Sequence, residues 1–443
     1  MTPIDFIPAL AWSDLPANVR RQAQLCLLDL LGVAAGGLQT DLSRIIRDHA
    51  VAMFGGTTPL LFDHRSASAA GAALAAGMTT DSLDGHDGYN PAKGHIGAPL
   101  IPAMLAMTHG RDISGAEFLT TLVLGYEFGA RAAVAQHATV PDYHTSGSWG
   151  AVTAAAAGAR LTGLDRDMCR HALGIAEYHG PRSQMMRCID HPTMLKDGAG
   201  WGAMTGVSAV DLAARGFTGA PAITVEDAPD HWNGLGTDWL IMEQYFKPYP
   251  VCRWAQSPIE GILTLARRHQ LSSDMVEHIE VTTFHESVRL ATSRPRNTEE
   301  AQYSTSFPCA VALVKGGVAP EDITGDTLHD PEILRLSTSL VMKESDHANE
   351  NFPSQRLSKV ALHLKDGRQL EGEYMNPLWA PDAPATEAEL VSKFRALTEP
   401  VLGIARSRAI EAAIDALPET DFHALETLLY QPISAETISG KSA

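Results

Sequence analysis

Apolar residues recur at helical spacing through most of the first 265 residues. The clearest case is the series Val19, Ala23, Cys26, Leu30 and Val33. The spacing predicts an amphipathic helix, and the glycine pair 36–37 that follows predicts its end. Alanine-rich stretches at 69–76 and 151–159 predict tightly packed core helices, because small side chains let helices approach closely.

The pattern changes near residue 270, where apolar and polar positions begin to alternate. Ile279, Val281 and Thr283 alternate with polar neighbours, and the segment 360–364 does the same before Asp366-Gly367. Alternation predicts strands, and an Asp-Gly pair between two such runs predicts a hairpin. A smaller mixed α+β unit is therefore expected over about 270–380.

Helical spacing returns near the C-terminus. Thr386 and Glu389 form a capping-box pair ahead of an apolar run that begins at Leu390. We therefore predict a mainly α fold: a large, discontinuous all-helical domain into which a smaller α+β domain is inserted. The expected boundaries are 1–268 for the first helical part, 269–382 for the inserted domain and 383–443 for the returning helices.

Composition narrows the class of protein. The 443 residues are 45% hydrophobic and 19% charged, as expected for a folded globular chain, and the formal net charge is −18. This charge argues against nucleic acid and anionic membrane as partners, while a small anionic ligand would respond only to its local pocket. Apolar runs are too short to span a bilayer, and the first residues lack the basic character of a targeting segment. The five cysteines are widely scattered, which favours a reducing cytoplasm over a disulfide scaffold or a zinc site.

The densest candidate segment is 81–103. It places Asp84, His86, Asp87, Lys93 and His95 among glycines and prolines before an apolar helix. So many ionisable groups in one loop indicate function, although the aspartates could simply cap a helix and His95 could be a core histidine. A metal site is the other interpretation. The spacing matches neither an EF-hand loop nor an H-E-x-x-H motif, and a lysine in the same loop would repel a cation, so we predict no metal.

Three further segments carry candidate chemistry. In the second, His144 and Ser146 precede an alanine-rich helix whose N-terminus could hold an anion; the surroundings of Ser148 do not form a G-x-S-x-G elbow. In the third, Lys196 is either a surface charge or an anion anchor. In the fourth, Lys247 and Arg253 lie among aromatics and prolines, which suits either a carboxylate clamp or a rigid connection. The pair Gly234 and Gly236 lacks the third glycine of a dinucleotide fingerprint, so no nucleotide cofactor is inferred.

These four segments, in this order, resemble the MmgE/PrpD, or 2-methylcitrate dehydratase-like, family. The most specific piece is the run Lys-Pro-Tyr-Pro-x-Cys, complete at 247–252. His144 falls on the family's second active-site histidine and Lys196 on the lysine before an Ala-Gly-Trp-like segment. The resemblance implies a large helical domain with a small α+β lid, a homodimer, and a cofactor-independent active site between domain and lid. Known family activities are dehydration of 2-methylcitrate, decarboxylation of cis-aconitate and epimerisation of iminodisuccinate.

The sequence also departs from this pattern. Asn90 and Arg253 stand where relatives often carry histidine, Lys93 is an added lysine, and Phe307 aligns loosely with a tyrosine of the decarboxylases. His179 and Arg182, with Arg187, add charge to a stretch that is usually blander. These departures indicate a pocket richer in cationic groups.

The expected mechanism is proton transfer at the carbon next to a carboxylate of a small di- or tricarboxylic acid. We predict His95 and His144 as proton carriers, Lys196 and Lys247 as stabilisers of enolate charge, and Asp84 as an orienting group. The predicted substrate-binding residues are Lys93, Asp87, Tyr89, Tyr249, Arg253, Ser146, His179 and Arg182. A dehydratase-like lyase ranks first; an epimerase, a decarboxylase and a non-catalytic polycarboxylate sensor are the alternatives.

Overall fold

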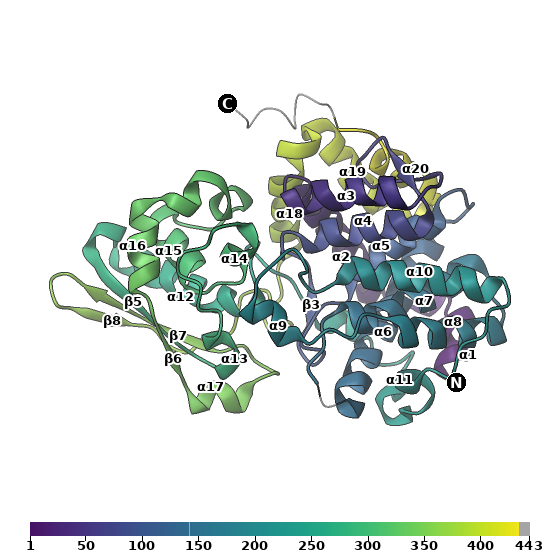
Figure 1. The fold of residues 1–443 in the computed structure, drawn as a ribbon, viewed down its shortest axis with the longest axis horizontal. Helices are drawn as coiled ribbons and strands as arrows, with labels where there is room; N and C mark the ends of the chain where they lie inside the picture. The colour runs from purple at the N-terminus through teal and green to yellow at the C-terminus, as the bar shows by residue number, and fades with distance from the viewer. Residues whose placement is uncertain (141, 434–443) are drawn as a thin grey trace.

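The protein is described here by a computed structural model that covers residues 1–140 and 142–433. Figure 1 shows two lobes joined along one side, with helices filling the larger lobe and the main sheet lying in the smaller one. The mainly α prediction is confirmed. The helices before the junction are α1 (Pro3–Ala9), α2 (Ala17–Gly37), α3 (Asp41–Met53), α4 (Ala69–Asp81), α5 (Gly97–Thr108), α6 (Gly115–Thr139), α7 (Gly147–Thr162), α8 (Arg166–His179), α9 (Met185–Asp190), α10 (Ala199–Ala214) and α11 (Ile223–Glu226).

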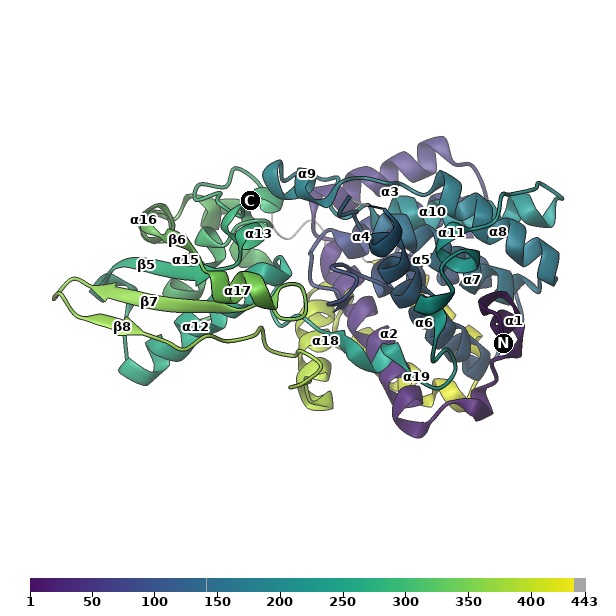
Figure 2. The same cartoon turned by 90° about the horizontal axis from the view of Figure 1, so that it is seen from below.

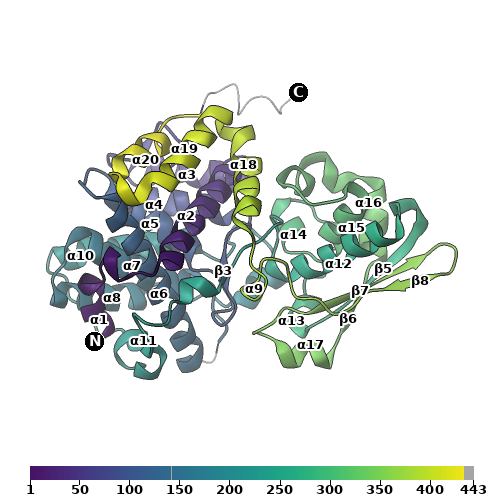
Figure 3. The same cartoon turned by 180° about the vertical axis from the view of Figure 1, so that it is seen from behind.

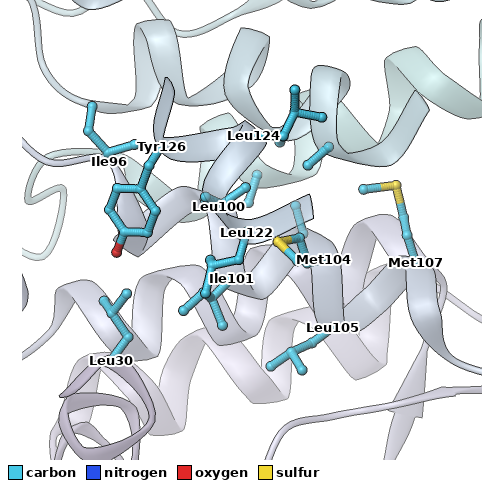
Figure 4. Packing of buried hydrophobic residues seen from close by; sticks show 14 of the residues in the cluster. Leu30, Ile96, Leu100, Ile101, Met104, Leu105, Met107, Leu122, Leu124 and Tyr126 are labelled. Atoms are coloured by element: carbon cyan, nitrogen blue, oxygen red, sulfur yellow. The ribbon is translucent and has the colours of Figure 1, made fainter. Parts of the chain in front are cut away.

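Helix α5 lies at the centre of the larger lobe, and all of its residues are buried. Leu100, Ile101 and Met104 of α5 pack among residues from α2 and α6, as Figure 4 shows. Each such side chain contributes about 1.5–3 kcal/mol to folding through its burial. The predicted helix at 19–33 is observed as α2, and the two alanine-rich stretches are observed in α4 and α7.

The smaller lobe is built on a four-stranded sheet in the order β6-β5-β7-β8. Its strands are β5 (Val276–Thr283), β6 (Val341–Glu344), β7 (Ser358–Leu364) and β8 (Gln369–Glu371), and only the β5–β6 pairing is parallel. The predicted hairpin is present between β7 and β8, where Gly367 has a φ of +87° that favours glycine. The long strands are seen best in Figure 2.

Helices of the smaller lobe cover this sheet. They are α12 (Arg253–His269), α13 (His285–Val288), α14 (Thr298–Gln302), α15 (Ser306–Lys315), α16 (Pro331–Ser339) and α17 (Asp346–Asn351). Ile259 and Ile262 of α12 share a hydrophobic core with Val281 of β5 and Leu362 of β7. The packing of α12 therefore joins it to the sheet, whereas the predicted boundary at 268/269 would separate them; the domain boundaries stay a prediction.

The chain then returns to the larger lobe through α18 (Glu387–Leu402), α19 (Ile404–Ala416) and α20 (Phe422–Leu429). The predicted capping box is present. The backbone N–H of Glu389 donates to the side-chain oxygen of Thr386, and the backbone N–H of Thr386 donates to the carboxylate of Glu389. Figure 3 shows α18 at the junction of the lobes, and it packs along α2. Within the described residues, no single helix reaches the length and hydropathy of a membrane span. Helices α2 and α3 reach them only when taken together, and the two are bent by 91° at their junction.

Candidate functional site

A short pairing between distant segments builds the junction of the two lobes. Strand β3 (Gly88–Tyr89) pairs antiparallel with β4 (Gln244–Tyr245), so that the first candidate segment lies beside the fourth. Figure 1 shows β3 at the edge of the larger lobe that faces the sheet. The structure therefore brings together two segments that are about 150 positions apart in the chain.

A narrow cavity lies at this junction, and both lobes contribute to its wall. Six charged or titratable side chains on this wall are those of Asp84, Lys93, His95, Asp197, Arg253 and Arg356. Aromatic residues complete the wall, among them Tyr143, Tyr245, Trp254 and Tyr303. All six ionisable residues except Lys93 are buried. A water-poor cavity with this many charged groups strengthens every electrostatic interaction inside it.

His95 presents one ring nitrogen to the cavity in a defined state. Its Nδ1 lies 2.5 Å from the carbonyl oxygen of Asp87, which can only accept, so Nδ1 carries the hydrogen and Nε2 keeps its lone pair. Burial lowers the pKa of His95 well below its usual value, and the neighbouring His86 and Lys247 lower it further. His95 is therefore a neutral imidazole whose Nε2 can accept a proton.

The backbone beside His95 is tightly enclosed. A Cβ atom at Gly94 would lie 2.6 Å from Cζ2 of Trp149 and 2.7 Å from Oγ of Ser146, so only glycine fits there. The backbone N–H of His95 donates to Ser146 Oγ at 3.0 Å, and its carbonyl accepts from Trp149 Nε1 at 2.9 Å. These contacts fix the imidazole relative to the cavity.

Asp197 lies directly beside His95. Its Oδ2 is 3.5 Å from His95 Nε2 and accepts a hydrogen bond of 2.7 Å from Ser146 Oγ, while its buried Oδ1 has no partner within the described chain. Burial raises the pKa of Asp197 to about 7, and the nearby carboxylates of Asp81 and Asp84 add to the rise. Sequence analysis missed this residue. Its only signal was its place after Lys196, in the third segment.

Asp84 and Lys247 form a buried ion pair at the edge of the cavity. Lys247 Nζ lies 2.5 Å from Asp84 Oδ1 and donates to the Asp84 carbonyl oxygen at 2.7 Å. Burial alone would raise the pKa of Asp84 and lower that of Lys247. Their mutual attraction, together with smaller contributions from other neighbouring groups, outweighs burial, so the pKa of Asp84 is lowered and that of Lys247 is raised. Both groups are therefore charged.

His86 lies behind His95 and completes a cluster that resembles a metal site. The two rings meet edge to face at 4.2 Å, and His86 Nε2 is 3.2 Å from Asp81 Oδ1. Asp84, His86 and His95 each offer a ligand atom, and these atoms lie within 4.8 Å of one another. However, the ammonium of Lys247 already occupies the Asp84 carboxylate and would repel a cation. The absence of a bound metal remains a prediction, and the position of Lys247 supports it.

Lys196 reaches the same region from the other side. Its Nζ donates to Gln302 Oε1 and lies 4.9 Å above the ring of Tyr303, which lines the cavity. Tyr303 also bears on the loose alignment at Phe307. The side chain of Phe307 is buried in the core of the smaller lobe, whereas Tyr303, four positions earlier, is one of the tyrosines on the cavity wall.

The backbone of the site is strained at three places. Asp84, Lys93 and Lys196 have φ values of +52°, +53° and +50°, which non-glycine residues rarely adopt. Each such conformation costs about 1–3 kcal/mol and persists only where the surroundings impose it. Half of the six positive-φ non-glycine residues in the described chain therefore belong to candidate functional segments.

Comparison with known proteins decides the family. A model of the MmgE/PrpD N-terminal domain matches residues 4–229, and a model of the MmgE/PrpD C-terminal domain matches residues 249–419. The chain belongs to the MmgE/PrpD family. A cis-aconitate decarboxylase of Aspergillus terreus is 23% identical over 474 residues, which cover 97% of this chain and 95% of that protein. The cis-aconitate decarboxylase-like protein oryM of Aspergillus oryzae is 24% identical over 464 residues, 93% of each chain.

The resemblance inferred from four sequence segments is thus confirmed, and with it the prediction that this MmgE/PrpD chain is an enzyme of the lyase kind. Of the predicted site residues, Asp84, Lys93, His95 and Arg253 line the cavity. Lys247 and Lys196 are bonded to groups at its edge. Arg356, from the loop before β7, is a second residue that sequence analysis missed, because no local motif marks it.

Other predicted residues of the family site lie off the cavity wall. His144 is buried, with its Nδ1 2.8 Å from the carbonyl oxygen of Asp142. Ser146 contacts His95 and Asp197 from behind. The carboxylate of Asp87 accepts from the Tyr126 hydroxyl, and the hydroxyl of Tyr249 donates to Glu260 at 3.0 Å.

Three further predicted substrate-binding residues also lie off this cavity in the single chain. Tyr89 is buried within the β3–β4 pairing, next to Gln244 rather than to the cavity. His179 ends α8, and Arg182 follows it in a loop; both are exposed. Their charge was the only signal in the sequence, and charge alone does not place a side chain on a cavity wall.

Proposed function

We propose that this protein is a cofactor-independent, dehydratase-like lyase that moves a proton at the carbon next to a carboxylate of a small di- or tricarboxylic acid. The observation that supports it most is the pairing of His95 with Asp197, 3.5 Å apart on the wall of a cavity that also holds cations. One group is a neutral base and the other, with a pKa of about 7, is partly a neutral acid near pH 7. Pairs of groups whose environments push their protonation states apart are typical of acid–base catalysis.

The cations supply the electrostatic part of the mechanism. Removal of a Cα proton places a second negative charge on the adjacent carboxylate as an enolate forms. Charged donors that are fixed beforehand in a dry cavity stabilise this charge without reorganising. Two cations are next to the cavity wall for this role: Lys247 donates to Asp84, and Lys196 Nζ lies 4.9 Å from the ring of Tyr303.

In a dehydration His95 would act as the base and Asp197 as the acid. His95 Nε2 takes the Cα proton, the C–O bond to the leaving hydroxyl breaks, and Asp197 gives that hydroxyl a proton so that it leaves as water. The step ends with an imidazolium beside a carboxylate. Because the two are 3.5 Å apart, a small movement lets the proton pass from His95 to Asp197 and restores both groups.

A decarboxylase is the second candidate, supported by the names of the Aspergillus relatives. There the C–C bond to a carboxylate breaks, CO2 leaves, and the electron pair on carbon takes a proton from Asp197 or from the hydroxyl of Tyr303. Burial raises the pKa of Tyr303 well above 10, so its hydroxyl keeps its proton. An epimerase is less favoured, because it requires carriers on opposite faces of the substrate while His95 and Asp197 lie side by side.

A non-catalytic sensor would have no use for such a pair. The remaining expectations follow the family: no bound cofactor or metal, a cytoplasmic location and a homodimer. The family expectation of His144 as a second proton carrier is not carried into this proposal, because its ring lies off the cavity wall and its Nδ1 is bonded to the Asp142 carbonyl oxygen. Neither nucleic acid nor a membrane is expected as a partner, given the charge of −18.

Incubation of candidate acids with the enzyme in D2O, followed by 1H NMR, tests this proposal. Loss of the Cα proton signal together with a new alkene signal is the expected result for a dehydratase. Release of CO2 identifies a decarboxylase, and exchange without a new product an epimerase. Tight binding with no exchange, no alkene and no CO2 from any di- or tricarboxylate would overturn the proposal.

A further inference from the structure

Two buried arginines face the cavity with hydrogen-bond donors unused. Arg253 begins α12 and is 4% exposed; Arg356 precedes β7 and is 2% exposed. Within the described chain, Nε and Nη2 of Arg253 and Nε and Nη1 of Arg356 have no hydrogen-bond partner. A buried guanidinium without an anion is costly, and buried charges in proteins are normally paired.

The contacts that these arginines do make hold them in place without neutralising them. Arg253 Nη1 donates to the carbonyl oxygens of Phe246 and Leu378 at 3.0 and 3.1 Å, and its guanidinium carbon lies 3.9 Å from the Tyr245 ring centre. Nε and Nη2 are on one edge of the guanidinium, the edge that binds a carboxylate with two parallel hydrogen bonds. Neither arginine has a carboxylate partner among the described residues.

Asn90 fixes the second arginine across the two lobes. Arg356 Nη2 donates to the Asn90 carbonyl oxygen at 3.4 Å, and Asn90 Nδ2 donates to the Ser354 carbonyl oxygen at 3.1 Å. Lys93 lies on the same cavity, 4.5 Å above the ring of Tyr143. Asn90, Lys93 and Arg253 are three of the positions at which the sequence departs from the family pattern, and all three lie near Arg356.

The charges of the cavity do not cancel. The Asp84 carboxylate is matched by Lys247, and the raised pKa of Asp197 leaves it partly neutral near pH 7. Lys93, Arg253 and Arg356 therefore remain as an excess of positive charge. Burial lowers the pKa of Arg253 to about 9, and the nearby Arg356 adds to this effect, so a bound anion would relieve both groups.

We infer that Arg253 and Arg356, assisted by Lys93, form a subsite for a carboxylate remote from the reacting carbon, and that this subsite selects the substrate. The inference rests on the proposed function, because it takes His95 and Asp197 as the reacting end of the same cavity. Arg253 binds the remote carboxylate through its free edge, and Arg356 adds a donor from the smaller lobe. The substrate therefore carries at least two carboxylates, and Asn90 is a positioning residue that holds Arg356.

Three acids that differ only in carboxylate number test the subsite: propane-1,2,3-tricarboxylate, pentanedioate and butanoate. Their affinities are measured by calorimetry for the full-length wild type and for Arg253→Gln and Arg356→Gln. Each substitution is expected to weaken the binding of the tricarboxylate and of the dicarboxylate by about 10- to 100-fold, which is the effect of losing a charged hydrogen bond. Butanoate, whose single carboxylate occupies the reacting end, should bind all three proteins equally weakly.

Arg268→Gln is the matched control, because Arg268 is exposed at the other end of the same helix α12. Arg253→Lys keeps the charge without the two-donor edge. It should fold as wild type, by circular dichroism, and bind the dicarboxylate with intermediate affinity, which keeps the test open if Arg253→Gln does not fold.

Two results would overturn the subsite: an equal loss for butanoate and for the dicarboxylate, or no loss for any acid. Failure of the proposed function is separate. It would show as an unchanged binding pattern in a wild-type enzyme that exchanges no Cα proton and forms no product in D2O.

Discussion

At the scale of single residues, environment rather than identity assigns the proton carriers. Burial acts on His95 and Asp197 alike, yet it favours the neutral form of each: it lowers the pKa of the imidazole and raises that of the carboxyl group. An anionic substrate would raise the pKa of Asp197 further and would bring the pKa of His95 back toward its usual value. The pair therefore enters the reaction as base and acid without net charge.

Asp197→Asn should lower kcat by about 100- to 10,000-fold, the usual contribution of a positioned acid. The wild-type kcat should also fall as pH rises through about 7, where Asp197 loses its proton, and the residual rate of the variant should not. A kcat–pH profile of both proteins measures this. Asp112→Asn, at an exposed loop position, is the control. If kcat of Asp197→Asn still falls as pH rises through about 7, the titrating group is not Asp197. It would then be Asp81 or Asp87, whose pKa values are also raised to about 7.

The two predicted histidines should separate in the same assay. His95→Ala should reduce kcat by about 100- to 10,000-fold with a normal circular dichroism spectrum, because Nε2 is the base. His144→Ala should reduce kcat by less than tenfold, because its ring lies off the cavity wall and is bonded to the Asp142 carbonyl oxygen. Equal losses in both variants would restore His144 as a proton carrier and place it within reach of the substrate during turnover.

Sequence reasoning found residues in or next to the cavity wall where unusual residues form local runs; their roles stay a prediction. The loop around Asp84 and His95 and the lysine motif at Lys247 were found because many unusual residues lie close together in the chain. Arg356 could not be found this way, since it stands alone in a loop. Its function arises only from a tertiary contact with Asn90, 266 positions away.

At the scale of elements, the returning helix α18 supports the site loop. Lys393 Nζ donates to Asp29 Oδ1 of α2 at 2.6 Å and to the Gly85 carbonyl oxygen at 2.7 Å. The C-terminal part of the chain therefore holds the loop that carries Asp84 and His86. The capping box and the β7–β8 hairpin were predictable because they depend on residues within one turn, whereas this bridge joins three distant segments.

Lys393→Met should lower the free energy of unfolding by about 3–5 kcal/mol, because it leaves the buried Asp29 carboxylate without its partner. Urea denaturation at pH 7 measures the change. The double variant Lys393→Met/Asp29→Asn should recover part of the loss, since the uncompensated charge is gone. Lys315→Met, which removes the exposed partner of the half-buried Asp322, should cost less than about 1 kcal/mol. A double variant no more stable than Lys393→Met would show that the bond to Gly85, and not the ion pair, provides the stability.

At the scale of the whole molecule, the cavity is assembled from both lobes. His95 and Asp197 belong to the helical lobe, whereas Tyr303 and Arg356 belong to the lobe with the sheet, and Figure 1 shows the two lobes meeting along one side. A protein with a net charge of −18 thus presents a locally positive hollow to an anion. The fold class was predictable because apolar residues repeat at helical spacing in the larger lobe and alternate in the strands of the smaller one. The way the lobes meet depends on contacts between distant residues, such as Asn90 and Arg356, which this spacing does not encode.

One face of the helical lobe is more apolar than its surface position requires. The exposed fractions are 69% for Leu195 and 42% for Trp201, which lie just before α10 and in its first turn. Leu195 and Trp201 line one hollow together with Lys196. Clustered exposed apolar side chains are typical of interaction surfaces, and the family expectation of a homodimer offers a second copy as their partner.

The purified protein should therefore have twice the 47.5 kDa mass of one chain when measured by size-exclusion chromatography with light scattering. Leu195→Glu combined with Trp201→Glu should give the mass of a single chain, because carboxylates buried in an apolar interface lose their hydration. Met53→Glu, at a residue 68% exposed on α3, should keep the doubled mass. If the double variant still dimerises, the interface lies on another face. If it is monomeric and loses activity while folded, the second copy supports Lys196 and the cavity behind it.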